Sequence, residues 1–170
     1  MPSAEHAIGP RPLYTPEERR RRDASPWTIV QGVLAPLQLL AFLVSVWLVL
    51  QFLRTGDGAT AATWSVLVKT GFLYAIMITG AIWEREVFGV WVFAPSFFWE
   101  DVVSTVVIAL HTAYLYVWLT DSMPLRDQFW LALLAYSSYV INAVQFFWKL
   151  QRAKRDQRNA ATNDDLWVPG

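Results

Sequence analysis

Ionisable side chains are concentrated in residues 83–114 of an otherwise apolar chain. They include Glu84, Glu86, Glu100, Asp101 and His111. Carboxyl and imidazole groups are the side chains that most often donate and accept protons during catalysis. Charged groups are costly at or inside a membrane span, where they mark a functional site by default. This stretch therefore predicts a site suited to acid–base chemistry.

The overall composition is that of an integral membrane protein. Of the 170 residues, 55% are hydrophobic and only 16% are charged, and the chain has ten Trp and ten Phe. Such a chain has too few polar side chains to cover an ordinary soluble domain. The absence of Cys excludes disulfides, thiolate metal sites and covalent c-type haem attachment. The net charge of zero gives no indication of a nucleic-acid partner.

Four apolar segments are long enough to cross a bilayer as helices, so the predicted fold is an all-α integral membrane protein with four transmembrane helices. The predicted spans are residues 27–53, 63–83, 101–119 and 128–150. Together they form a membrane domain over residues 27–150. Residues 1–26 are polar and predict a mobile cytosolic arm, and residues 151–170 are charged and predict a disordered cytosolic tail.

The distribution of basic residues predicts the orientation of these spans. Lys and Arg are concentrated before the first span and after the fourth, whereas the two expected external loops carry only Arg54 and Arg126. The positive-inside rule then places both termini, and the loop that joins the second and third spans, in the cytoplasm. The carboxylates would face the cytoplasm. Lys69, inside the second span, is expected to extend to the outer interface or to pair with a carboxylate.

Two of the predicted helices carry a polar face. At 3.6 residues per turn, the residues of the third span that share one face are Glu100, Ser104, Val107, His111 and Tyr114. The polar residues at three- and four-residue spacing in the fourth span are Tyr139, Asn142, Gln145 and Lys149. Polar groups inside a membrane bundle satisfy one another across helices, so these faces are expected to meet. Asp101 lies beside this face, where it could instead cap the helix.

An aromatic segment joins the second and third spans and is too short to cross the bilayer and return. It reads VFGVWVFAPSFF and is interrupted by Gly89 and Pro95, which favours an interfacial or re-entrant segment. Its aromatic residues, with the Trp that follows, are Trp91, Phe93, Phe97, Phe98 and Trp99. They fit an ordinary interfacial belt, and the same surface would suit a flat aromatic ligand.

Several runs of residues resemble one known family. They are YTPEERRRRDASPWTIVQGVLAPLQ, YAIMITGAIWEREVFG, FAPSFFWEDVVS, IALHTAYL and AYSSYVINAVQF. In this order, over residues 14–149, they resemble the small membrane proteins called 3-vinyl, or 2-vinyl, bacteriochlorophyllide hydratases. The resemblance implies hydration of the C3 vinyl group of a chlorophyllide to a 1-hydroxyethyl group in bacteriochlorophyll synthesis. It implies a chlorophyllide-type tetrapyrrole as substrate, other pigment-synthesis enzymes as candidate partners, and a bacterial inner or intracytoplasmic photosynthetic membrane.

Hydration of a vinyl group needs an acid that protonates the terminal carbon, a base for the incoming water and a fixed pose of the macrocycle. A carboxyl group in an apolar site can stay protonated near neutral pH. We expect Glu100 to be the acid and Asp101 or Glu84 to be the base. His111 is expected to ligate the magnesium of the pigment or to act as an alternative acid. The expected substrate contacts are Trp91, Phe97, Phe98, Trp99, Tyr114, Asn142 and Gln145.

No cofactor is expected, because the chain has no motif for a nucleotide, a flavin or a metal of its own. Two non-enzymatic alternatives are a scaffold that holds pigment or assembly partners, and a small proton-coupled transporter. Against the transporter, the carboxylates crowd the ends of the spans and the two halves of the chain show no internal symmetry. A scaffold would use the same aromatic residues and His111, so the sequence leaves that alternative open.

Overall fold

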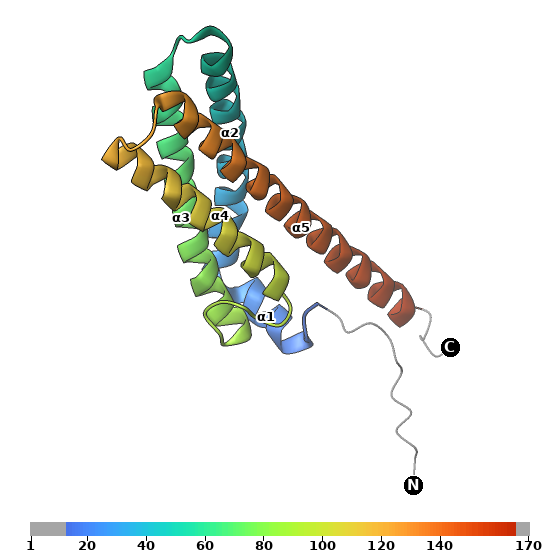
Figure 1. Ribbon diagram of the computed structural model, residues 1–170. Helices are drawn as coiled ribbons and strands as arrows, with labels where there is room; N and C mark the ends of the chain where they lie inside the picture. Colours follow the sequence, from blue (N-terminus) through green and yellow to red (C-terminus); the bar gives the residue numbers. More distant parts are fainter. Residues whose placement is uncertain (1–12, 166–170) are drawn as a thin grey trace.

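The structure is a computed structural model in which residues 13–165 are described, with side chains described as far as Arg155. The described helices are α1 (Pro16–Ala24), α2 (Pro26–Thr55), α3 (Ala59–Phe88), α4 (Phe98–Thr120) and α5 (Leu125–Asp165). Figure 1 shows α2 running beside α3 and α4 running beside α5, with the second pair crossing the first. The short helix α1 packs against α3 at one end of the bundle. The fold is therefore two helical hairpins with a short helix at their base.

Four of these helices are long and apolar enough to cross a membrane, which confirms the predicted all-α membrane fold. The candidate spans are Pro26–Thr55, Ala59–Phe88, Phe98–Thr120 and Leu125–Arg155. Each contains the corresponding predicted span and extends beyond it at both ends. The helices α2 and α3 stop at Gly56 and Gly89, whose φ angles of 81° and 80° lie in the left-handed region that glycine adopts readily.

Two apolar clusters hold the helices together. The first joins the four long helices, and its buried members include Val49, Val66, Tyr114, Phe129 and Tyr136. The second lies at the α1 end of the bundle, and its buried members are Tyr14, Val87, Phe97 and Ala153. Residues from α3, α5, the segment before α1 and the residue before α4 thus meet in the second cluster, which supports the end of the bundle that carries the carboxylates.

Both ends of the chain are more regular than the sequence predicts. Over residues 13–25 the N-terminal arm contains α1, which packs against α3, and the Tyr14 ring is buried between Phe88 and Phe97. In the tail, α5 continues from residue 151 to Asp165. The remaining parts of these two segments, residues 1–12 and 166–170, lie outside the described residues.

Candidate active site

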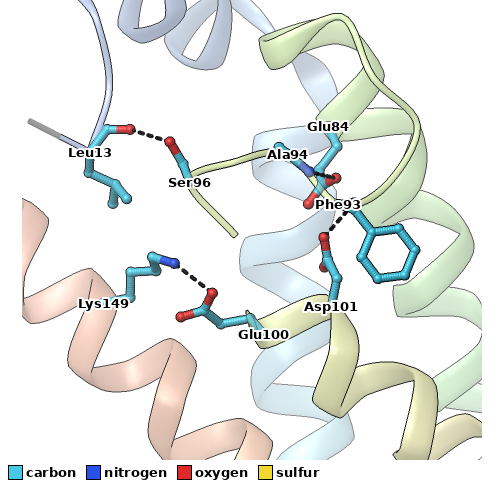
Figure 2. Close-up of polar contacts among 8 residues, drawn as sticks. All are labelled: Leu13, Glu84, Phe93, Ala94, Ser96, Glu100, Asp101 and Lys149. Carbon is cyan, nitrogen blue, oxygen red and sulfur yellow. Dashed lines mark hydrogen bonds and ion pairs between the residues drawn. The ribbon is translucent and has the colours of Figure 1, made fainter. Parts of the chain in front are cut away.

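The three predicted carboxylates lie together at the α1 end of the bundle. Glu84 is near the end of α3, and Glu100 and Asp101 are in the first turn of α4. The loop that joins these helices, residues 89–97, folds back toward the carboxylates (Figure 2). All three side chains are buried in the protein. Two helices and one loop therefore build this site.

Glu84 and Asp101 are buried carboxyl groups held by the same loop. The backbone N–H of Phe93 donates to Asp101 Oδ2 at 2.7 Å, and that of Ala94 donates to Glu84 Oε2 at 3.5 Å (Figure 2). Two carboxylates this close repel each other strongly, so such a pair favours a state that keeps one proton. The backbone hydrogen bond to Asp101 is the shorter of the two, so the loop holds Asp101 more closely than Glu84.

Phe93 holds the loop in this position with an unusual backbone conformation. Its φ angle of 61° lies in the left-handed region, which residues other than glycine seldom adopt. Such a conformation costs about 1–3 kcal/mol and persists only where the surroundings determine it. Here the backbone N–H bonds Asp101, and the Phe93 ring packs against Phe98 with centroids 5.8 Å apart. The strained residue therefore directs a backbone donor at the carboxylate.

Glu100 belongs to an ion pair with α5. Lys149 Nζ lies 2.5 Å from Glu100 Oε2 (Figure 2). The same Nζ lies 4.6 Å from the centroid of the Phe97 ring. The Lys149 and Glu100 side chains are only 20% and 11% exposed. In a low-dielectric setting an adjacent ammonium favours a charged carboxylate. Glu100 is therefore paired with α5, next to the other two carboxyl groups.

The aromatic residues of the loop divide into a buried and an exposed set. Phe97 is buried, and its ring packs against Trp83, Phe88 and Phe146. The exposed aromatic residues are Trp91, Phe93, Phe98 and Trp99. Of the four rings predicted to contact a flat ligand, three are therefore accessible and Phe97 supports the loop from the inside. Phe93 adds an accessible ring that was not among the predicted substrate contacts.

His111 lies deep in the bundle, away from the carboxylates. It follows Asp101 by ten residues along α4, which corresponds to a rise of about 15 Å. His111 Nδ1 donates to the carbonyl oxygen of Val107 at 2.8 Å, so Nε2 accepts from Lys69 Nζ, 2.6 Å away. In this arrangement both ring nitrogens are engaged within the bundle, and neither is free for a magnesium ion.

Lys69 takes neither of the two roles predicted for it. Its side chain is fully buried, so it does not extend to the interface, and its amine contacts His111 in place of a carboxylate. The amine also lies 4.3 Å and 5.2 Å from the ring centroids of Tyr139 and Tyr136. The side chain is retained inside because α4 and α5 supply an acceptor nitrogen and two aromatic faces.

The other predicted contacts are spread along the bundle. Tyr114 is fully buried in the first apolar cluster, far from the carboxylates. Asn142 Nδ2 donates to Ser104 Oγ at 2.5 Å, which joins the two predicted polar faces. Gln145 lies one turn before Lys149 on α5, and within the described chain its buried Oε1 has no hydrogen-bond partner. Gln145 is the member of this set with a free acceptor near the ion pair.

Sequence reasoning missed the backbone donors and the ion-pair partner of Glu100. Lys149 already belonged to the predicted polar face of the fourth span, so the spacing carried a signal for its contact with α4. The N–H groups of Phe93 and Ala94 had no such signal, because any residue except proline has a backbone N–H and only the loop conformation directs it.

Comparisons with known proteins identify the family of the chain. Residues 14–152 match the family described as 2-vinyl bacteriochlorophyllide hydratase. A relative of that name from Rhodobacter capsulatus is 59% identical over 154 residues, which cover 91% of this chain and 90% of the relative. Another from Cereibacter sphaeroides is 58% identical over 159 residues, which cover 94% of this chain and 96% of the relative. No solved structure matches the chain. The chain therefore belongs to the 2-vinyl bacteriochlorophyllide hydratase family.

Proposed function

We propose that this protein adds water across the C3 vinyl group of a chlorophyllide-type tetrapyrrole and forms a 1-hydroxyethyl group. Family membership supplies the reaction class. The observation that carries the assignment of the site is the buried pair of carboxyl groups, Glu84 and Asp101, beside exposed aromatic residues. Such a pair combines a proton donor and a proton acceptor, which are the two groups that hydration of a vinyl group requires.

In the proposed mechanism, Glu84 transfers its proton to the terminal carbon of the vinyl group. The adjacent carbon becomes electron-deficient, and the conjugated macrocycle delocalises that charge. Water then forms the new C–O bond while Asp101 accepts one of its protons. That proton returns to Glu84 through the contact between the two carboxyl groups, so each cycle adds one water molecule and consumes no acid. No nucleotide, flavin or added metal takes part in this scheme.

Glu100 has a separate role in this proposal. As the partner of Lys149 it is an anion close to the carboxyl pair. The ammonium of Lys149 offsets most of this negative charge, so Glu100 is suited to fixing α4 against α5 beside the reacting groups. We therefore assign protonation of the substrate to Glu84 and a supporting role to Glu100. The buried acceptor of Gln145 is suited to receive a hydrogen bond from the water or the new hydroxyl.

The macrocycle would lie against the exposed aromatic residues Trp91, Phe93, Phe98 and Trp99. A planar ligand can stack on such side chains, and an amphipathic pigment would reach them from the membrane interface. We propose that the loop lies at this interface and that Phe97 holds it from beneath. His111 is not assigned to the magnesium of the pigment, because Lys69 and Val107 already engage both of its ring nitrogens.

We further propose that the α1 end of the bundle faces the cytoplasm of a bacterial inner or intracytoplasmic photosynthetic membrane. The basic residues near both termini support this orientation through the positive-inside rule. Reporter fusions in the loop 89–97 should then report the cytoplasm, and fusions at Gly58 and Ser122 should report the external side. A periplasmic signal from the loop would contradict this orientation.

Isotope-labelled hydration tests the reaction and its residues together. Membranes containing the protein are incubated with 3-vinyl chlorophyllide in oxygen-18 water, and the product is analysed by mass spectrometry. We expect incorporation of one labelled oxygen. In Glu84→Gln and Asp101→Asn, turnover should fall by roughly 10²- to 10⁴-fold while pigment binding persists, the range typical of losing general acid or base catalysis. Asp127→Asn, an exposed site at the opposite end of the bundle, is the matched control.

Three outcomes discriminate among the hypotheses. Near-normal turnover in both Glu84→Gln and Asp101→Asn would refute the assignment of the pair. If Glu100→Gln alone abolished turnover, the proton donor would be Glu100. Pigment that binds to the unmodified protein but never acquires oxygen-18 would support a non-enzymatic scaffold that uses the same aromatic residues.

A further inference from the structure

Residues 13–25, which we call the N-terminal strap, comprise α1 and the segments on either side of it. The Ser25 hydroxyl donates a hydrogen bond to Glu86 on α3. Near the other end of the strap, Tyr14 is only 6% exposed, and the Arg22 guanidinium lies 4.8 Å from the centroid of its ring. The strap is thus packed into the bundle, and no step of the proposed reaction uses it.

The strap contacts both ends of the loop between α3 and α4. The Tyr14 ring stacks on Phe88, the last residue of α3, with centroids 5.8 Å apart and an interplanar angle of 12°. It also lies 6.3 Å from the ring of Phe97, the residue before α4. Ser96 Oγ donates to the carbonyl oxygen of Leu13 at 3.1 Å (Figure 2). The N-terminal strap therefore contacts the chain at both ends of this loop.

The middle of the same loop carries the backbone donors that meet the carboxyl pair. Phe93 and Ala94 direct their N–H groups at Asp101 and Glu84, and Phe93 does so with a φ angle of 61°. A strained conformation of this kind relaxes unless its surroundings hold it. The contacts at the two ends of the loop oppose that relaxation.

We propose that the N-terminal strap is a positioning element of the active site, in which Tyr14 and the Leu13–Ser96 contact hold the loop so that its N–H groups stay aligned with the carboxyl pair. Tyr14 is a positioning residue, because it touches neither the reacting groups nor the carboxylates. This inference rests on the proposed hydration at Glu84 and Asp101.

The test compares Tyr14→Ala with Tyr14→Phe in the hydration assay with 3-vinyl chlorophyllide. Tyr14→Ala removes the stacked ring and should lower kcat by roughly 10- to 100-fold, the scale expected when catalytic groups are misplaced by about 1 Å. KM should change little, because the exposed aromatic residues are untouched. Tyr14→Phe keeps the ring and should restore kcat. Tyr116→Ala, an exposed tyrosine of α4, and deletion of residues 1–12 are the controls.

A double-mutant cycle separates positioning from general stability. If the strap acts through the carboxyl pair, Tyr14→Ala should lower the residual turnover of Glu84→Gln far less than it lowers that of the unmodified protein. Equal factors in both backgrounds, or an unchanged kcat in Tyr14→Ala alone, would overturn the inference. If Tyr14→Ala fails to accumulate in membranes, Ser96→Ala, which removes one hydrogen bond, replaces it in the same cycle. Full activity in Glu84→Gln would instead refute the proposed chemistry, whatever the effect of Tyr14→Ala.

Discussion

The contact between Lys69 and His111 predicts that removing either residue alone has a different effect from removing both. The two side chains are fully buried between α3 and α4, and their nitrogens lie 2.6 Å apart. His111→Leu leaves the Lys69 amine without its acceptor nitrogen in the interior. Leaving a buried polar group without its hydrogen-bond partner costs about 1–3 kcal/mol. Replacing both partners by apolar residues of similar size is often neutral or stabilising.

We therefore expect His111→Leu to lower the free energy of unfolding by about 1–3 kcal/mol, and Lys69→Met to recover most of that loss in the His111→Leu background. Lys69→Met alone leaves His111 Nε2 without its donor and should cost about 1–3 kcal/mol. The assay is denaturant titration of the purified protein in detergent micelles or nanodiscs, followed by Trp fluorescence. Tyr74→Phe, which removes an exposed hydroxyl that bonds Thr112 between the same two helices, is the control.

Activity measurements complete the test of this pair. His111 is ten residues from Asp101 along α4, so the double variant should keep its kcat and its affinity for pigment with or without magnesium. The reasoning would be refuted if Lys69→Met made His111→Leu less stable still. A loss of affinity in His111→Leu that disappears with a magnesium-free pigment would return His111 to the role of metal ligand that the sequence suggested.

Three further predictions concern the site and its supports. Lys149→Met leaves Glu100 without its partner and should lower the free energy of unfolding by about 1–3 kcal/mol. Adding Glu100→Gln to Lys149→Met should recover that loss. Denaturant titration measures the stability of the single and the double variant. Burial raises the pKa of Tyr14 above its ordinary value of 10.0. As pH rises, the Tyr14 hydroxyl therefore loses its proton in the unfolded chain before it does so in the folded protein. The stability that Tyr14 contributes should be complete below pH 10 and decline above it. That decline should be absent in Tyr14→Phe when unfolding is followed at increasing pH. Asn142→Leu removes the donor to Ser104 and should cost about 0.6–2 kcal/mol without lowering kcat, so a large fall in kcat at unchanged stability would show that this contact belongs to the chemistry.

Hydropathy was sufficient to predict the four spans, because lipid selects long apolar runs without regard to their partners. Helical periodicity also predicted that the third and fourth spans would present polar faces to each other, and the Asn142–Ser104 hydrogen bond and the Lys149–Glu100 ion pair join those faces. The ends of the spans were less predictable. Helical hydrogen bonding continues beyond the apolar run until a residue such as Gly89 stops it.

The sequence by itself determined the class of protein, the number of spans and the stretch of chain in which the carboxylates gather. Only the tertiary structure decided which of them meet. Glu84 and Asp101 are held together because the loop 89–97 turns back and bonds both of them, whereas Glu100 is turned toward α5 and is paired with Lys149. The contacts of these carboxyl groups depend on the backbone angles of the loop and on how the two hairpins cross. A local pattern of residue types encodes neither of these. For the same reason the buried orientation of Phe97 emerged only from the packed structure.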